Sequence, residues 1–165
     1  MMKEIIEEGR PFKYVSESET IMTELVLPND TNQLGNLLGG KLMHWIDICA
    51  ATAAARHSNK VCVTAAVDKI DFHHPIKLGE LVILKASVNR VFNTSMEVGV
   101  KVFAENIRTG EIKHTNSAYL TFVSLDEYGK PCLAPLVKPV TDDQKRRYEQ
   151  ALIRRGYRIE QAKKK

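Results

Sequence analysis

The chain of 165 residues has a formal net charge of +4, with 44% hydrophobic and 27% charged residues, which is typical of one soluble domain and excludes a disordered, collagen-like or low-complexity protein. No run approaches the roughly 18 uncharged apolar residues that a membrane span requires, and the acidic start MMKEIIEEGR is unlike a signal peptide. We therefore expect a cytoplasmic protein with a single domain over residues 1–165. Its core would cover about 12–137, and a basic C-terminal helix and tail would cover 138–165.

Charge and cysteine content narrow the possible ligands. Residues 138–165 carry ten Lys or Arg residues against four acidic ones. Such a segment either attracts the phosphates of a nucleotide-like ligand, nucleic acid or acidic lipid, or forms a solvated helix face. The three cysteines form no CxxC pair and the five histidines form no HExxH motif, so we expect no metal ion.

The first half of the chain predicts a strand, a loop and a long helix. Alternation of apolar and polar residues indicates a strand over 13–27, and the Pro, Asn, Asp and Gly residues of 28–36 indicate a loop. After Gly39-Gly40, the segment KLMHWIDICAATAAARHSN has apolar side chains around nearly its whole circumference. This pattern is typical of a buried helix, here about 17 residues long.

The second half predicts an antiparallel sheet and a surface helix. Strand-like runs near 60–73, 80–92, 95–108 and 111–125 are separated by turn sequences, and Thr141 with Gln144 forms a capping box that opens a polar helix ending at Gly156. A helix that is apolar on every side must be covered by other elements. The predicted strands are the only elements that could cover it, as a curved antiparallel sheet. The expected class is therefore α+β, a hot-dog fold with a C-terminal surface helix.

Asp47 is the most unusual residue of the predicted helix, because it places a carboxylate among apolar side chains. It interrupts the apolar helix with no cation three or four residues away, unless His44 is protonated. A desolvated carboxylate is costly unless it is paired or faces a polar cavity. Asp47 is therefore either a structural carboxylate at a groove or subunit boundary, or a general base or nucleophile.

Gly39 and Gly40 stand at the start of the same helix, where backbone N–H groups lack intrahelical partners and the helix dipole is positive. Such an end can receive an anion or a developing oxyanion, although a tight loop-to-helix turn explains the glycines equally well. Gly40 precedes Asp47 by seven residues, or roughly 10 Å of helix axis. One chain could thus offer both an oxyanion donor and a base.

Other catalytic motifs do not fit. Residues 35–42 imitate a phosphate-binding loop, but Leu42 replaces the hydroxyl residue that such a loop needs. No serine, cysteine or threonine lies in a GxSxG-like turn. Any hydrolysis would depend on a carboxylate or on water.

The segments LPNDTNQLGNLLGGKLMHWIDICAATAAARHSN, VTAAVDKIDFHHPIKLGE and NTSMEVGVKV closely resemble the hot-dog acyl-CoA thioesterases, specifically the brain-type acyl-CoA hydrolase family and its single-domain bacterial members. The resemblance covers about residues 17–155. It implies a hydrolase of lipid metabolism that converts acyl-CoA to free fatty acid and CoA, with no cofactor besides the CoA of the substrate. It also implies dimers and, beyond them, hexamers built as trimers of dimers.

The resemblance further implies roles for particular residues. Asp47 would act as general base or nucleophile, together with Asn32 from the neighbouring subunit, and the backbone N–H of Gly40 would polarise the thioester carbonyl. A thioester needs little more, because its thiolate departs without strong acid assistance. The residues expected to contact the rest of the substrate are Gly39, Thr64, Asn93, Thr94 and Ser95. The basic tail would then meet the phosphates of CoA.

Three other functions compete with this interpretation. A non-enzymatic acyl-CoA sensor on the same fold would keep the CoA groove but lose the base, and the presence of both Asp47 and Asn32 argues against it. A dehydratase would pair a catalytic histidine, such as His44 or His73, with the carboxylate. A nucleic-acid binder is suggested only by the basic tail, and the chain has no motif or aromatic platform for that role.

Overall fold

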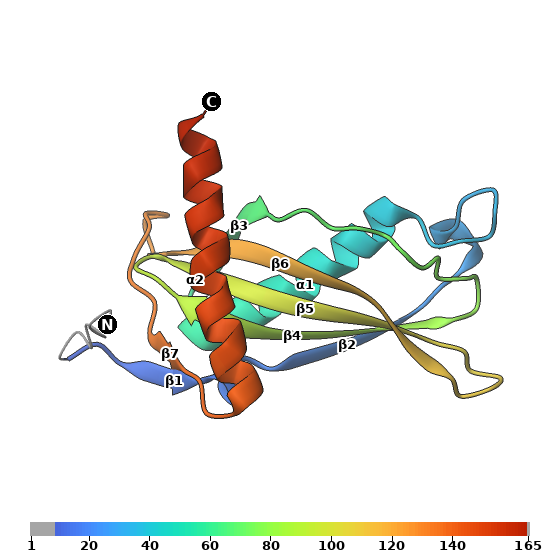
Figure 1. The fold of residues 1–165 in the computed structure, drawn as a ribbon, viewed down its shortest axis with the longest axis horizontal. Helices are drawn as coiled ribbons and strands as arrows, with labels where there is room; N and C mark the ends of the chain where they lie inside the picture. The colour runs from blue at the N-terminus through green and yellow to red at the C-terminus, as the bar shows by residue number, and fades with distance from the viewer. Residues whose placement is uncertain (1–8, 165) are drawn as a thin grey trace.

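A five-stranded antiparallel sheet separates two helices in the computed structural model, which describes residues 9–164 (Figure 1). The strands lie in the order β2 (Thr20–Leu25), β4 (Leu81–Val91), β5 (Ser95–Glu105), β6 (Ile112–Leu125) and β3 (Val61–Val67). The long helix α1 (Gly39–Ser58) lies along one face of this sheet, and α2 (Asp142–Lys163) crosses the other. The curved sheet wrapped on one long helix is the arrangement predicted from the element order.

The core lies between α1 and the sheet. Ile46, Cys49, Ala50, Ala53 and Ala54 of α1 are all fully buried. The alanines allow the strands to approach the helix axis closely, and this close packing maximises dispersion contacts. The helix begins at Gly39 and spans 20 residues, somewhat more than predicted. It ends where Asn59 adopts a left-handed conformation with φ 54°.

Alternation along the strands divides the sheet into an α1 face and an α2 face. Met96 and Val98 of β5 are buried on the α1 face, whereas Glu97 between them points to α2. On β4, Asn89 occupies a bulge between Val88 and Arg90, and its side chain fills the space beside Gly99. A Cβ at Gly99 would lie 2.8 Å from the Asn89 amide nitrogen, so a side chain here would displace the amide that donates to Glu97.

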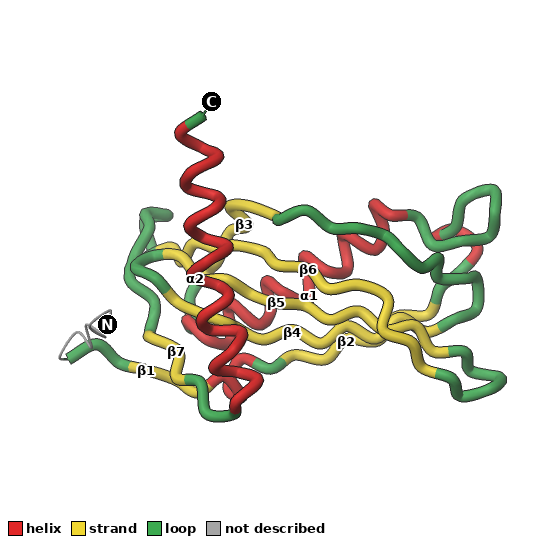
Figure 2. The backbone as a smooth tube through the Cα atoms, viewed as in Figure 1, coloured by secondary structure: helices red, strands yellow, loops and turns green. Residues whose placement is uncertain are grey.

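The predicted strand over 13–27 is wrong as a single element. The chain forms β1 (Phe12–Tyr14), a 3-10 turn (Val15–Ser18) and then β2. The side chain of Ser18 interrupts the strand because its hydroxyl donates to the Val15 carbonyl and accepts from the Val88 N–H. β1 instead pairs in parallel with β7 (Leu136–Lys138), a three-residue strand too short to show a sequence pattern; both lie at one end of the molecule in Figure 2.

Two predicted boundaries also need correction. The run near 60–73 forms a strand only as far as Val67, and residues 68–80 leave the sheet as a loop. The C-terminal helix opens with the predicted Thr141 cap, whose hydroxyl accepts from the Gln144 N–H at 3.1 Å, but it continues through Gly156 to Lys163. Contacts of Arg154 and Arg158 with the sheet flank Gly156 and outweigh its helix cost of about 1 kcal/mol. Within the described residues, no helix is long and apolar enough to cross a membrane.

Candidate active site

Asp47 lies at the margin of an uncovered face of α1. His44 and Ile48 beside it are exposed, and Asp47 itself is half-buried, while the opposite side of the helix is packed against the sheet. The prediction that α1 is buried all round is therefore wrong for the isolated chain. The carboxylate stands at the boundary between the core and the open face of the helix.

Thr64 of β3 is the hydrogen-bond partner of this carboxylate. Its hydroxyl donates to Asp47 Oδ1 over 2.7 Å. The register of the sheet explains the contact, because Thr64 pairs with Phe122, which is fully buried on the α1 face. The bond fixes the rotamer of Asp47 and uses one of its two oxygens, so the second oxygen remains available to a reactant.

The glycine pair forms the first turn of α1, as predicted. Among the described residues, the N–H groups of Gly39 and Gly40 have no hydrogen-bond acceptor, whereas the next two amides bond to the Leu38 carbonyl. A Cβ at Gly39 would lie 3.8 Å from the ring of Phe72, and a Cβ at Gly40 would meet nothing within 4 Å. Both N–H groups are therefore free to bind a developing negative charge.

Asn32 stabilises the loop that precedes α1. Its Oδ1 accepts from the N–H groups of Leu34 (2.9 Å) and Asn36 (3.2 Å). The Nδ2 group has no acceptor in the part of the chain that the structure describes, and neither Asp47 nor Thr64 contacts Asn32 there. The Nδ2 group thus remains available as a hydrogen-bond donor, while Oδ1 holds the loop.

Asn93, Thr94 and Ser95 lie at the turn between β4 and β5, apart from the Asp47–Thr64 pair. The Asn93 and Thr94 carbonyls already accept bonds from Arg10 and Ser124, respectively. Ser95 pairs with Val123 and precedes the buried Met96 by one residue, which places its side chain on the α2 face. Their predicted contact with CoA stays a prediction.

The histidines contribute no visible catalytic pair. Neither His44 nor His73 contacts Asp47 in residues 9–164, so the histidine–carboxylate arrangement of a dehydratase is not formed in one chain. No group of three His, Cys, Asp or Glu residues in that range could hold a metal ion.

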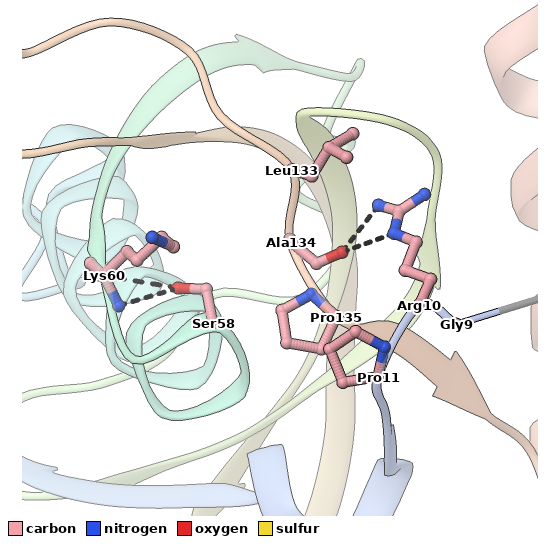
Figure 3. A pocket seen from close by; sticks show the side chains of 8 residues that line it. All are labelled: Gly9, Arg10, Pro11, Ser58, Lys60, Leu133, Ala134 and Pro135. Atoms are coloured by element: carbon pink, nitrogen blue, oxygen red, sulfur yellow. Dashed lines mark hydrogen bonds between the residues drawn. The ribbon is translucent and has the colours of Figure 1, made fainter.

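A cavity of about 440 Å³ lies elsewhere, at the C-terminal end of α1 (Figure 3). Arg10 crosses it to the Ala134 carbonyl, and Ser58 binds the Lys60 N–H. None of the predicted site residues lines this cavity. Thr64 is exposed and Asp47 is half-buried, so the pair lies on an open surface of the described chain.

Sequence reasoning missed a charged cluster beneath α2. Glu97 is fully buried, and its carboxylate accepts from Arg154 at 2.7 Å and from Asn89 at 3.0 Å. Burial disfavours the charge on Arg154, but the hydrogen bond to Glu97 and the negative charge of Glu97 outweigh this effect and raise the pKa of Arg154. Arg158 binds Asp68 at 3.0 Å. These two arginines of the basic segment therefore bind acidic residues of the same chain. Their partners are so distant in sequence that no local motif could predict the pairs.

Comparison with known proteins identifies the family. Residues 34–111 match the thioesterase superfamily. The chain is 43% identical to an uncharacterized acyl-CoA thioester hydrolase of Bacillus subtilis, YkhA, over 132 residues that cover 80% of this chain and 77% of the relative. An apo-hexameric acyl-CoA thioesterase superposes with a TM-score of 0.89 and 43% identity, covering 92% of this chain and 97% of that one.

A Staphylococcus aureus acyl-CoA hydrolase, solved with butyryl-CoA and CoA, is 37% identical, with a TM-score of 0.86 over 93% of this chain and 96% of that one. Alanine variants of one asparagine, one aspartate and one threonine of that enzyme have also been solved. Those positions are spaced by 15 and 17 residues, as are Asn32, Asp47 and Thr64. The chain belongs to the thioesterase superfamily, among the hot-dog-fold acyl-CoA thioester hydrolases.

Proposed function

We propose that this protein hydrolyses acyl-CoA thioesters to free fatty acid and CoA, at a site shared by two copies of the chain. The observation that carries the proposal is the 2.7 Å bond between Thr64 and Asp47, which holds a carboxylate on the uncovered face of α1. The free N–H groups at the start of the same helix supply the second element that acyl transfer requires.

In the proposed reaction, Asp47 accepts a proton from water while the water oxygen attacks the thioester carbonyl carbon. The N–H of Gly40 donates to the carbonyl oxygen as that oxygen becomes negative. The carbon–sulfur bond then breaks, and CoA leaves as a thiolate that takes up a proton. Alternatively, Asp47 attacks the carbonyl directly and displaces the thiolate, and water hydrolyses the resulting mixed anhydride.

Asn32 acts in this proposal from the neighbouring subunit. Its Oδ1 is committed to the loop, so its Nδ2 is the group that orients the water or the carbonyl. The absence of contact between Asn32 and Asp47 among the described residues of one chain favours such a shared site. The same spacing of the three residues altered in the Staphylococcus hydrolase supports the assignment.

The proposed dimer forms through β3. This strand pairs with β6 on one side only, and its other edge has no partner in the described chain. An open strand edge is a template for pairing with another chain, and a two-fold related β3 would make one continuous ten-stranded sheet. Three such dimers would give a hexamer, the assembly of the related hexameric thioesterases.

The direct test is thiol release from a panel of acyl-CoAs, from C2 to C18, by wild type and Asp47→Asn at equal concentrations. We expect cleavage by wild type and a loss of kcat of about 10²- to 10⁴-fold in the variant, because a positioned base typically contributes that much. Full activity of Asp47→Asn would contradict the proposed base. CoA binding without cleavage of any ester by wild type would instead support the sensor.

A further inference from the structure

The helix α2 is longer than the sheet that it crosses. Its Tyr148 carbonyl accepts from Arg90 of β4 at 3.2 Å, and its Arg158 binds the residue that follows β3. Between these two anchors the helix rises about 15 Å, which matches the roughly 14 Å from β4 to β3 across the sheet. The residues after Arg158 therefore extend α2 by about 7 Å beyond the β3 edge, as the C-terminal end of the helix shows in Figure 1.

Two alanines on the same face of α2 show where the helix passes beyond the edge of the sheet. Ala151 is fully buried against the sheet. Ala162 follows it by three helical turns and points to the same side, yet it is exposed. Ile159, which flanks this line, is 43% exposed. Ala162 in the last turn of α2, with Ile159 to one side of it, thus lies on the sheet-facing side of the helix with no sheet of its own chain beneath it.

An apolar surface lies uncovered on the same side of the sheet, on β3. Val61 and Val63 of β3 are 70% and 44% exposed. Because Thr64 points to α1, its neighbour Val63, and Val61 two residues before, point to the α2 face. These valines lie at the start of β3, whereas α2 passes over its end, beside Asp68.

We propose that the last turn of α2 reaches across the dimer seam and packs on Val61 and Val63 of the partner subunit. This inference rests on the proposed pairing of β3 with a second copy. Two-fold antiparallel pairing places the end of one β3 beside the start of the other, which is where the overhanging turn of each α2 would lie. Each chain carries both halves of the contact, so the two copies clamp each other at two equivalent places.

The test compares two glutamate substitutions on one helix. Ala162→Glu places a charge on the overhanging, sheet-facing position, and Ile153→Glu places the same charge on the outward face, where Ile153 is 58% exposed. Sedimentation velocity over a dilution series measures dimer dissociation. We expect Ala162→Glu to raise the dissociation constant by about ten-fold or more, because its carboxylate would be desolvated against Val61 and Val63, and Ile153→Glu to leave it unchanged.

A cross-linking experiment locates the contact. A photo-reactive residue at position 162, in oligomers mixed from ¹⁴N- and ¹⁵N-labelled chains, should give cross-links between the two isotopes that map to the start of β3. Normal dimerisation of Ala162→Glu, with no such cross-links, would overturn this inference and leave the β3 pairing intact. A wild-type protein that stays monomeric at all concentrations would overturn the proposed assembly itself.

Discussion

At the residue scale, the pairing of Asp47 with Thr64 converts an anomalous helix carboxylate into an oriented one. The Thr64 hydroxyl binds one carboxylate oxygen and leaves the other accessible. The bond also restricts the rotamers that the carboxylate can adopt. Thr64 is thus a positioning residue in the proposed reaction. Its contribution can be separated from that of Asp47 by substitutions that change a single atom group.

Thr64→Val removes the hydroxyl and keeps the shape of the side chain, whereas Thr64→Ser keeps the hydroxyl. We expect Thr64→Val to lower kcat about ten-fold, the effect of losing one hydrogen bond to a charged group, and Thr64→Ser to retain most activity. KM for a medium-chain acyl-CoA should change little in both. Equal losses in kcat for the two variants would show that Thr64 acts through its packing and not through its bond to Asp47.

His57 provides a second residue-scale prediction, for stability. It is fully buried, its Nε2–H donates to the Pro135 carbonyl at 2.8 Å, and its Nδ1 has no partner among the described residues. Burial, only partly offset by this bond, lowers the pKa of His57 below its ordinary 6.5. Below that pH the unfolded chain therefore binds a proton that the folded chain resists.

The free energy of unfolding should accordingly fall as the pH drops below about 6.5. Urea midpoints at a series of pH values measure this slope. His57→Gln keeps a donor for Pro135 but does not titrate, so its slope should be flatter than that of wild type. The exposed His44→Gln is the control, and an identical slope in wild type and His57→Gln would contradict the prediction.

At the scale of elements, charged contacts are a main part of the attachment of α2 to the sheet. Ala151 is its one fully buried side chain within the described residues, while Glu97 beneath it accepts three bonds from Arg154 and one from Asn89. Removing one partner of such a group leaves an uncompensated buried charge. The docking of α2 should therefore depend strongly on Glu97.

Glu97→Gln should reduce the free energy of unfolding by at least about 2 kcal/mol, measured by urea denaturation. The matched control on the same helix is Arg146→Ala, which breaks the exposed pair with Asp143 and should cost less than about 1 kcal/mol. Joint replacement by methionine, Glu97→Met with Arg154→Met, should recover part of the loss. Similar costs for Glu97→Gln and Arg146→Ala would contradict this account of the docking.

The elements also show which features the sequence could predict. Hydrophobic periodicity located α1 and four strands, and capping chemistry located the start of α2, because these signals are local. The 3-10 turn at Val15–Ser18 and the passage of α2 through Gly156 were missed, because contacts with distant residues such as Val88 and Glu97 decide them. The sequence alone showed that Asp47 is an unusual carboxylate in an apolar helix. Its bond to Thr64, 17 residues away, could be found only in the folded structure.

At the scale of the whole molecule, three regions of the described chain lie uncovered or unpaired. The face of α1 beside Asp47 is open, β3 has a free edge in the described chain, and the end of α2 has no sheet beneath it. A second copy related by a two-fold axis at β3 would cover all three regions. In the proposed function, catalysis therefore depends on assembly, since the donor of Asn32 would reach Asp47 only between chains.

Subunit complementation tests this central claim most directly. Asp47→Asn and Asn32→Asp are each expected to be nearly inactive, and Asn32→Asp keeps the loop acceptor while losing the donor. When the two variants are mixed, unfolded and refolded together, half of the dimers pair unlike chains, and each such dimer has one site with both native residues. We predict activity of about a quarter of wild type in the mixture. If tagged chains prove to have exchanged and the mixture remains as inactive as its components, the two residues do not meet across subunits and the shared site is wrong.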